Sequence, residues 1–411
     1  MPGRFVIIGA GPAGMRAAEV LRQKSPEAEI TLIGDEPHPP YDRPPLSKAF
    51  LTESVATEKL HLKPAAFYAA QHIGLRLGAR AIAIDRARKQ VELAGGEHIA
   101  YDKLLLAMGC RSRKLPETLA GAPVHYLRSL ADAAAIRGAL QPGLELVLIG
   151  GGFIGLEIAA SATKLGAGVT VLEMAPRLMG RAVPQRVSDF VRALHERHGV
   201  EFEFGAKLGG VARAGDGRLL VETERQGYPA DLIVAGIGAA PNTELAEAAG
   251  LAVEDGVRVD AQGRSSDPDI FAAGDVTRHD NPLLGRAIRV ESWQVALNQG
   301  AAVAAAMLGA SEPYAELPWL WTDQYDCNIQ ALGLFEPSLE TLERRDPANA
   351  GAFTLLGLDG DGRIAAAITV NSGRDMAVLR RLVALRAKLP RERLGDSAQK
   401  LSDLLKAARS A

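Results

Sequence analysis

The chain contains 411 residues, of which 47% are hydrophobic and 23% charged, and its formal net charge at pH 7 is −2. This length exceeds one compact core and predicts two or three domains. A nearly neutral chain has no general attraction for nucleic acid, and no apolar run approaches the roughly 18 residues of a membrane span, so we expect neither partner.

The first residues and the cysteines indicate the cellular compartment. The segment "MPGRFVIIGAG" enters a strand pattern at once and leaves no room for a signal peptide. Cys110 and Cys327, the only two cysteines, form neither a CxxC motif nor a zinc-ligand cluster, and such sparse use fits a reducing compartment. We therefore expect a cytoplasmic protein with no disulfide and no metal site.

One supersecondary pattern occurs twice: an apolar strand, a glycine turn, a helix, and a second strand that ends near an acidic residue. The first copy consists of a strand over 4–9, the glycines Gly9, Gly11 and Gly14, a helix over 15–25 and a strand over 28–36 that contains Asp35. The second copy consists of a strand over 144–150, the glycines Gly150, Gly152 and Gly155, a helix over 153–166 and a strand over 168–173 that ends at Glu173. This repeat predicts two halves with the same fold.

Further strands complete the halves and begin a third domain. A buried strand is expected over 101–109 after the first copy and over 230–242 after the second, and a later short strand leads to Gly274 and Asp275. Beyond residue 317, strands are expected over 328–334, 353–358 and 363–370, and helices over 375–388 and 400–410. The expected fold class is α/β, with two Rossmann-like dinucleotide-binding domains and a C-terminal α+β domain. The expected boundaries are 1–114 with 248–318 for the first domain, 115–247 for the second and 319–411 for the third.

A glycine-rich turn between a strand and a helix can bind the pyrophosphate of a dinucleotide. Unpaired N–H groups at the helix N-terminus attract the anion, and glycine lets the backbone approach it closely. The acid at the end of the second strand, Asp35 or Glu173, can accept hydrogen bonds from ribose hydroxyls. One such loop could be only a tight turn, but two complete copies predict two dinucleotides. FAD with a nicotinamide cofactor is the natural pair, because flavin accepts the hydride that nicotinamide donates.

The second acid favours NADH over NADPH. Glu173 would repel the additional phosphate on the adenosine ribose of NADPH. Arg177 and Arg181 follow it in the sequence and could reach that phosphate, so the alternative stays open.

The motifs resemble those of the flavoprotein disulfide reductase superfamily, and within it the oxygenase-coupled NADH-dependent ferredoxin reductases. The match covers nearly the whole chain through "IGAGPAG", "YDRPPLSK", "YLRSLADA", "IGGGFIGLE", "AGIGAAPN", "AAGDV", "RVESWQVALNQG", "LPWLWTDQ" and "RDMAVLRRL". The segments "RPPLSK" and "WLWTDQ" are specific to this branch, whereas the glycine loops are shared by the superfamily. The resemblance implies a glutathione-reductase-like arrangement, with FAD and NADH as cofactors.

The resemblance also implies the site residues. The implied FAD contacts are Gly9, Gly11, Ala13, Gly14, Asp35, Arg43, Lys48, Ala81, Arg128, Gly274, Asp275, Trp293 and Trp321. The implied NAD contacts are Gly150, Gly152, Ile154, Gly155, Glu157, Glu173, Gly236, Ile237 and Gly238. The residues implied at the reacting rings are Lys48 beside the flavin, Glu157 as its partner bordering the nicotinamide, and Glu291 and Trp293 flanking both rings. Trp319 is an alternative to Trp321 as the aromatic wall.

Each of these residues also has a plainer interpretation. Lys48 and Glu157 could be an exposed ion pair of little energetic weight, and the two tryptophans could be core aromatics. Asp275 could cap a helix, and Arg128 could be an ordinary surface residue. One departure from the family pattern is Met108 in place of a threonine, and we expect the turn over 107–109 to survive it.

The cysteines limit where the electrons can go. No cysteine pair follows the first glycine loop, and Cys110 is expected to be a small buried or partly exposed thiol. Reduced flavin is therefore expected to pass its electrons to a one-electron carrier outside the protein. The resemblance implies that this carrier is an acidic [2Fe-2S] ferredoxin, which in turn supplies a Rieske dioxygenase or a cytochrome-type monooxygenase. A basic docking patch could come from Arg344, Arg345, Arg374, Arg380, Arg381 and Arg386, or these could be scattered surface arginines. The alternatives are a rubredoxin reductase and an apoptosis-inducing-factor-like flavoprotein whose redox state controls association.

Overall fold

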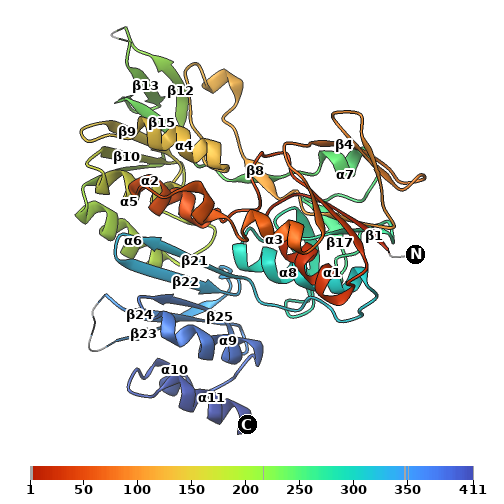
Figure 1. Cartoon of the computed structure of the whole chain (residues 1–411). Helices are drawn as coiled ribbons and strands as arrows, with labels where there is room; N and C mark the ends of the chain where they lie inside the picture. The colour runs from red at the N-terminus through yellow and green to blue at the C-terminus, as the bar shows by residue number, and fades with distance from the viewer. Residues whose placement is uncertain (1–2, 216, 347–348, 350, 411) are drawn as a thin grey trace. The chain divides into compact units, whose positions relative to one another are not determined.

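The computed structural model describes residues 3–215, 217–346, 349 and 351–410, and Figure 1 labels its helices and strands. Contacts divide the chain into two compact units. Unit 1 contains the described residues of 1–43, 56–111 and 239–318, and unit 2 those of 44–55, 112–238 and 319–411. The three-domain division drawn from the sequence stays a prediction.

Unit 1 is built on a five-stranded parallel sheet in the order β18-β7-β1-β2-β3. Its strands are β1 Arg4–Ile8, β2 Glu29–Ile33, β3 Ile73–Arg76, β7 Lys103–Leu106 and β18 Ile270–Ala272. Two helices, α1 Pro12–Lys24 and α8 Trp293–Met307, pack against each other beside this sheet. The strand order places the turn after β1 at the point where the sheet changes direction, which is where open α/β sheets bind ligands.

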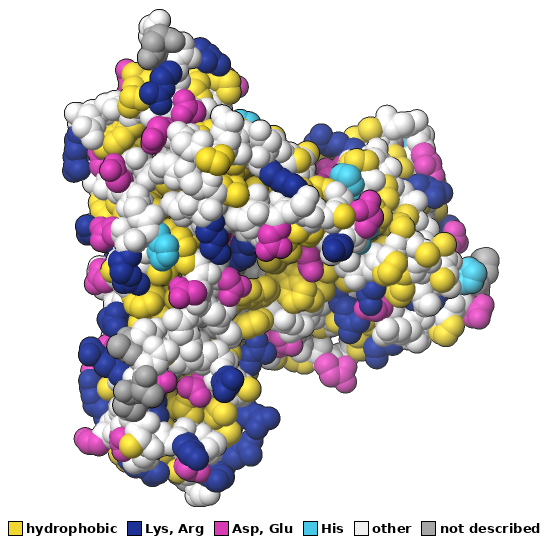
Figure 2. Space-filling model, turned by 60° about the vertical axis from the view of Figure 1, so that its left-hand side comes forward, with side chains coloured by type: hydrophobic (Ala, Val, Ile, Leu, Met, Phe, Trp, Pro, Cys, Tyr) yellow, Lys and Arg dark blue, Asp and Glu magenta, His cyan; other side chains and the backbone are white. Residues whose placement is uncertain are grey.

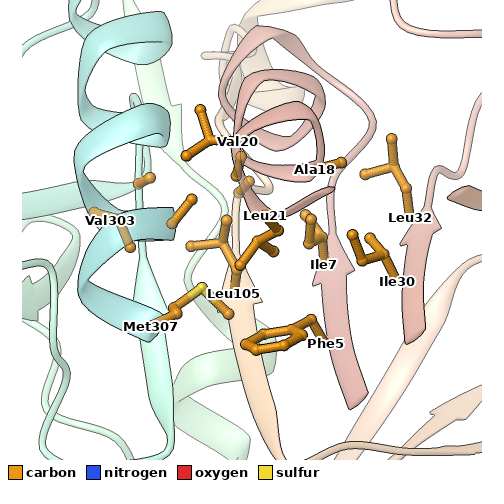
Figure 3. Close-up of a cluster of buried hydrophobic side chains, with 14 of the residues drawn as sticks. Phe5, Ile7, Ala18, Val20, Leu21, Ile30, Leu32, Leu105, Val303 and Met307 are labelled. Carbon is orange, nitrogen blue, oxygen red and sulfur yellow. The ribbon is translucent and has the colours of Figure 1, made fainter. Parts of the chain in front are cut away.

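The core of unit 1 lies between the parallel sheet and these two helices. Figure 3 shows Ile7 and Leu105 of the sheet facing Leu21 of α1, with Val303 and Met307 arriving from α8. Ile7, Leu21, Leu105 and Val303 are fully buried. Burial of such side chains contributes about 1.5–3 kcal/mol each, so this core anchors both ends of the first glycine loop.

Smaller elements surround the sheet of unit 1. Two three-stranded sheets comprise β4 Ala81–Asp85, β5 Gln90–Leu93 and β6 His98–Ala100, and β17 Val257–Val259, β19 Thr277–Asn281 and β20 Arg286–Ile288. The remaining short elements of this part are the helices η2 Thr57–Leu60, α3 Ala65–Ala70 and α7 Glu244–Ala248, and the strands β8 Cys110–Ser112 and β16 Ala239–Pro241. The sequence analysis did not predict the β4-β5-β6 sheet.

Unit 2 repeats the parallel topology of unit 1 in the order β11-β10-β9-β15. Its strands are β9 Glu145–Ile149, β10 Gly168–Glu173, β11 Val200–Phe204 and β15 Leu232–Ala235. Its helices here are α2 Ala49–Thr52, α4 Leu130–Ala139, α5 Phe153–Lys164 and α6 Gln185–Arg197. In both units the first strand pairs with the second on one side and with the return strand on the other, so the expected fold class is confirmed. A further antiparallel sheet consists of β12 Leu208–Arg213, β13 Leu219–Thr223 and β14 Gly227–Ala230.

The C-terminal part of unit 2 is an antiparallel sheet with helices, as expected. The sheet order is β21-β22-β25-β24-β23 (Figure 1). Its strands are β21 Trp319–Gln324, β22 Cys327–Leu332, β23 Glu340–Arg345, β24 Phe353–Leu358 and β25 Ile364–Val370. The helices are α9 Met376–Ala384, α10 Arg391–Gly395 and α11 Leu401–Ser410. Side chains of β22, β24 and β25 share a buried cluster with α6, which fixes this sheet against α6 within unit 2.

A buried histidine in unit 1 predicts acid sensitivity. His279 of β19 is 2% exposed, and neither ring nitrogen has a hydrogen-bond partner among the described residues. Its ring packs edge-on against Tyr314 with centroids 5.5 Å apart. Burial lowers the pKa of His279 from 6.5 to about 4. The imidazole is therefore neutral in the fold above that value.

We expect unit 1 to lose stability as the pH falls from 6.5 toward 4. The pKa of His279 is lower in the folded state than in the unfolded chain, so His279 does not destabilise the fold above pH 6.5. Below that pH the unfolded chain takes up a proton that the fold resists, and at pH 5 this lowers the free energy of unfolding by about 2 kcal/mol. Replacing His279 with Leu should remove this loss and raise the urea midpoint at pH 5, whereas replacing the exposed His98 with Leu should not. An equal decline in the H279L and native proteins would contradict the assignment.

Candidate dinucleotide-binding sites

The first glycine loop joins β1 to α1 in unit 1. Gly9 has φ +116°, and a Cβ there would lie 2.1 Å from the carbonyl oxygen of Ala107. A Cβ on Gly14 would lie 2.0 Å from the carbonyl oxygen of Gly9. Gly11 precedes the first turn of α1, and a Cβ there would have nothing within 4 Å. Two glycines thus permit the close packing of the turn, and the third leaves open space at the helix N-terminus for a phosphate.

The second glycine loop, between β9 and α5 in unit 2, has the same geometry. A Cβ on Gly150 would lie 2.6 Å from the carbonyl oxygen of Gly236, and one on Gly155 would lie 2.6 Å from that of Gly150. Gly152 precedes α5, and its nearest neighbour would be 3.9 Å away. Neither α1 nor α5 carries an acidic residue in its first turn, so no negative charge there competes with a bound anion.

The two predicted ribose acids differ in their surroundings. Asp35 follows β2 by two residues and is exposed. Glu173 ends β10, and its two carboxylate oxygens accept hydrogen bonds of 2.7 Å from the backbone N–H groups of Gly151 and Ala175. The side chain of Glu173 is therefore held against the second glycine loop, with lone pairs remaining for a ribose hydroxyl.

The two arginines after Glu173 are also distinct. The guanidinium of Arg177 donates to the backbone carbonyls of Val183 and Gly180, each at 2.6 Å. Arg181 is exposed. Arg177 is thus engaged in holding its own loop, which leaves Arg181 as the exposed cation of the pair.

Unit 1 brings several predicted FAD contacts to the C-terminal ends of its strands. Asp275 follows β18 and accepts a hydrogen bond from Cys110, whose Sγ lies 3.4 Å from its Oδ2. Cys110 is 4% exposed and is therefore a buried thiol. A Cβ on Gly274 would lie 3.1 Å from that of Ala13, so Gly274 packs directly against the start of α1.

Other predicted residues of unit 1 are engaged with neighbouring side chains. The indole Nε1 of Trp293, at the start of α8, donates to Oδ1 of Asp42 at 2.7 Å, and burial raises the pKa of that carboxyl. Arg43 forms an ion pair of 2.9 Å with Glu36. Ala81 begins β4 and is partly buried.

Glu291 stands apart from the buried predicted residues of unit 1. It is exposed and forms an ion pair of 2.5 Å with Arg289. Its predicted place beside the reacting rings stays a prediction.

The turn over 107–109 retains its form despite Met108. The side-chain amide of Asn242 donates to the carbonyl of Met108 at 2.8 Å, and its backbone N–H donates to the carbonyl of Gly109 at 3.0 Å. Asn242 therefore holds this turn with two hydrogen bonds, although Met108 has no side-chain hydroxyl to contribute one. The sequence analysis assigned no role to Asn242.

In unit 2, the partly buried Lys48 forms an ion pair with the buried carboxylate of Glu157. Lys48 Nζ lies 2.8 Å from Glu157 Oε1, and the two side chains are 22% and 7% exposed. The same carboxylate accepts hydrogen bonds from the hydroxyls of Ser47 and Thr322. The interpretation of this pair as an exposed surface contact is therefore wrong. Its chemical role stays a prediction.

The aromatic residues of β21 stack on each other. The rings of Trp319 and Trp321 have centroids 5.1 Å apart and planes inclined by 25°. The guanidinium of Arg380, on α9, lies 4.5 Å above the Trp319 ring. Both tryptophans are partly exposed, so each keeps a surface that an aromatic ligand can contact.

The remaining predicted residues of unit 2 lie near α4, α5 and β15. Arg128 precedes α4 and donates its backbone N–H to Asp132 at 3.0 Å. Ile154, in the first turn of α5, is 47% exposed beside the second glycine loop. The partly buried residues that follow β15 are Gly236, Ile237 and Gly238.

Comparison with known proteins agrees with this geometry. Residues 3–300 match the pyridine nucleotide-disulphide oxidoreductase family, and residues 319–405 match the family described as reductase C-terminal. The chain belongs to the pyridine nucleotide-disulphide oxidoreductase family. One similar protein is the ferredoxin–NAD(+) reductase component of an anthranilate 1,2-dioxygenase system from Burkholderia cepacia. It is 50% identical over 402 residues, which cover 98% of this chain and 99% of that protein.

Two further similar proteins are also reductases of small electron carriers. The chain aligns over its whole length with the reductase in a crystal structure of the covalent putidaredoxin reductase–putidaredoxin complex. The TM-score is 0.93 at 37% identity, and 99% of that chain is covered. A rubredoxin–NAD(+) reductase from Pseudomonas putida is 42% identical over 333 residues, covering 80% of this chain and 86% of that protein. The predicted resemblance is confirmed.

FAD and NADH are therefore the cofactors of this chain, and both loops fit them. Each loop combines an open helix N-terminus with glycines that admit no side chain, as a dinucleotide pyrophosphate requires. Gly11 immediately precedes α1 and Gly152 immediately precedes α5, and their predicted contacts with the pyrophosphates of FAD and NADH stay predictions. The sequence analysis missed the polar neighbours of the site, namely Asp42, Ser47, His195, Asn242, Thr322 and Gln324.

Proposed function

We propose that this protein passes electrons from NADH to the acidic [2Fe-2S] ferredoxin of an oxygenase system. The observation that carries the proposal is the matched pair of glycine loops together with the buried Lys48–Glu157 pair. When bound, FAD supplies a ring that accepts a hydride and releases electrons singly. The chain itself would hold both cofactors and keep a positive charge at Lys48 near the flavin.

The predicted catalytic residues enter this proposal in separate roles. Lys48 would favour negative charge on the flavin, and Glu157 would hold Lys48 in place and border the nicotinamide. Trp293 and either Trp319 or Trp321 would cover the rings, and Glu291 would flank them. Asp35 and Glu173 would accept hydrogen bonds from the ribose hydroxyls of FAD and NADH, respectively.

The cysteines support an outlet outside the protein. The chain has two cysteines, and both are buried thiols that belong to no disulfide. Burial raises the pKa of Cys327 to about 12, so its thiolate is scarce at neutral pH. These properties support an electron outlet other than a thiol relay, and two free thiols also support a cytoplasmic location.

A basic face on the C-terminal part of unit 2 supports an acidic partner. Figure 2 shows Lys and Arg side chains gathered there. The exposed arginines are Arg345, Arg374, Arg380, Arg381 and Arg386. The prediction was wrong for Arg344, which is 7% exposed and donates to the carbonyls of Leu394 and Gln399. Arg345 and Arg386 are paired with Glu343 and Asp359, which leaves the cluster on η4 (Gly373–Asp375) and α9 as the docking face.

The proposal is tested by turnover with a panel of electron acceptors. Purified holoenzyme with NADH would be assayed with [2Fe-2S] ferredoxins of dioxygenase and monooxygenase systems, with rubredoxin, and with each omitted. Cytochrome c reduction that depends strongly on a ferredoxin is the expected result. Equal rates with and without every carrier would contradict the proposal and favour a flavoprotein whose redox state controls association.

A rubredoxin partner is the second candidate. This candidate is supported by the 42% identity to the rubredoxin–NAD(+) reductase. It ranks second because the identity to the reductase component of the anthranilate dioxygenase system is higher, at 50%. In the same panel, a kcat/KM at least ~10-fold higher with rubredoxin than with any ferredoxin would select it.

Glu173 predicts the choice of nicotinamide cofactor. Its carboxylate is held at the second loop by Gly151 and Ala175, where it would repel a ribose phosphate. We expect the native enzyme to prefer NADH and replacement of Glu173 with Gln to lower the ratio of kcat/KM for NADH over NADPH by ~10-fold. Replacing Glu201, an exposed acid on the neighbouring strand β11, with Gln should leave the ratio unchanged. An unchanged ratio in E173Q would assign the preference to another residue.

A further inference from the structure

A chain of buried polar side chains in unit 2 leads from the C-terminal sheet to Glu157. Thr322 Oγ1 lies 2.6 Å from Glu157 Oε1, and Gln324 Nε2 lies 3.1 Å from Thr322 Oγ1. His195 Nε2, on α6, lies 2.7 Å from Gln324 Oε1, and Tyr325 Oη lies 3.3 Å from His195 Nδ1. Thr322, Gln324 and His195 are each no more than 1% exposed.

The direction of each hydrogen bond in this chain follows from its ends. A carboxylate only accepts, so the Thr322 hydroxyl donates to Glu157. Its oxygen must then accept from the amide N–H of Gln324, which turns the carbonyl oxygen of Gln324 toward His195. His195 therefore donates from Nε2 and, as a neutral ring, accepts at Nδ1 from the Tyr325 hydroxyl. Every donor in the chain points toward Glu157.

Burial keeps this direction fixed. Burial lowers the pKa of His195 to about 4, so the ring stays neutral at physiological pH. Tyr325 has φ +57° in the turn after β21, and its ring stacks on His198 with centroids 3.7 Å apart. An aromatic residue adopts this left-handed conformation only when its surroundings hold it there. The turn and α6 thus anchor the far end of the chain.

We propose that Thr322, Gln324 and His195 are positioning residues that hold the Glu157 carboxylate in the orientation in which it fixes Lys48. Aligned hydrogen bonds in a buried site reinforce one another, and only the last of them, from Thr322, shares the Glu157 carboxylate with Lys48. The C-terminal sheet thereby helps to set the charge presented to the flavin. The inference rests on the proposed role of Lys48 near the flavin, but not on the identity of the electron acceptor.

The first test replaces Thr322 with Val in the holoenzyme and follows flavin reduction by NADH without any ferredoxin. Loss of this hydrogen bond to a charged group should slow flavin reduction at saturating NADH by ~10-fold, with little change in the NADH dissociation constant. The flavin midpoint potential should fall as well. Without the hydrogen bond from Thr322, the Glu157 carboxylate offsets more of the positive charge of Lys48, and less of that charge remains to favour reduced flavin. T322S restores the hydroxyl and should recover both the rate and the potential.

The matched control is Thr369 on β25, in the same C-terminal sheet. Thr369 is fully buried, and its hydroxyl has no hydrogen-bond partner among the described residues. T369V therefore makes the same chemical change in the same sheet outside the polar chain, and it should leave the rate and the potential unchanged. Native values for both properties in T322V, or equal shifts in T369V, would overturn the inference.

The second test concerns His195, which makes no contact with Glu157. H195L removes the Nε2 donor and should slow flavin reduction by ~3-fold, whereas H195Q retains a donor at the same position and should recover the rate. The T322V/H195L double variant should be no slower than T322V, because both changes break one chain. Multiplied effects in the double variant would overturn the inference, as would equal rates for H195L and H195Q. The comparison of H195L with H195Q does not involve T322V, so it decides the matter even when T322V does not fold. A native enzyme that reduces its flavin but no ferredoxin would refute only the proposed partner.

Discussion

Replacing Lys48 with Met should slow flavin reduction by NADH by ~100-fold, the effect typical of removing one preorganised electrostatic group. Lys48 is the cation paired with the buried carboxylate of Glu157. Its loss removes the positive charge that favours reduced flavin and leaves a buried negative charge supported only by hydroxyls. Stopped-flow bleaching of the flavin at saturating NADH measures the rate.

The same substitution should destabilise unit 2 by about 3 kcal/mol, because a buried charge without its partner is costly. The K48M/E157Q double variant should recover most of this stability but not the rate of flavin reduction. Replacing Lys59, an exposed lysine, with Met should change neither property. Flavin bleaching at the native rate in K48M would contradict the proposed role of Lys48.

Replacing Gly14 with Ala should abolish FAD binding and yield a colourless protein. The new Cβ would lie 2.0 Å from the carbonyl oxygen of Gly9, so β1 and α1 would have to separate. We expect unit 1 to lose ~3 kcal/mol or more of stability through overpacking. The flavin absorbance of the purified protein and its urea unfolding measure the two effects.

Gly11 offers the matched substitution that separates binding from folding. A Cβ there has nothing within 4 Å, and Gly11 has φ −95°, which any residue adopts. G11A should therefore fold with a cost of about 1 kcal/mol, yet bind FAD at least ~10-fold more weakly because the methyl group takes the space of the pyrophosphate. Gly138, in α4 and also without neighbours within 4 Å, is the control, and G138A should bind FAD normally. If G11A bound FAD with native affinity, the FAD pyrophosphate would have to lie away from Gly11.

The first two strands of each parallel sheet could be predicted from sequence because their signals are local, whereas the edge strands β3 and β11 were not predicted. The apolar runs at β1 and β9, the glycine spacing and the following helices all lie within about 30 residues, and the observed strands differ from the predicted ones by a few residues at their ends. The β12-β13-β14 sheet escaped prediction because its strands are short and half-exposed. Two adjacent glycines, Gly209 and Gly210, also interrupt the alternation in β12.

The polar chain to Glu157 could not be predicted in the same way, because its members are distant in sequence. Thr322 and Glu157 are 165 residues apart, and Gln324 and His195 are 129 apart. One signal was available: "WTDQ" alternates so that Thr322 and Gln324 share one face of a strand, and polar side chains on a buried face require partners.

The error at Arg344 has a related cause. "ERR" was interpreted as surface charge, but alternation along β23 turns Arg344 inward and Arg345 outward.

The alternation in β21 also limits how this strand can change during evolution. Thr322 and Gln324 meet Glu157 and His195 on one face, while Trp319 meets Arg380 on the other. Inserting or deleting a single residue within β21 would rotate the following side chains by half a turn and exchange the two faces. Aromatic rings would then face a buried carboxylate, and the polar pair would face α9. Natural variants of this strand should therefore differ by replacement at constant length, with indels confined to the flanking loops.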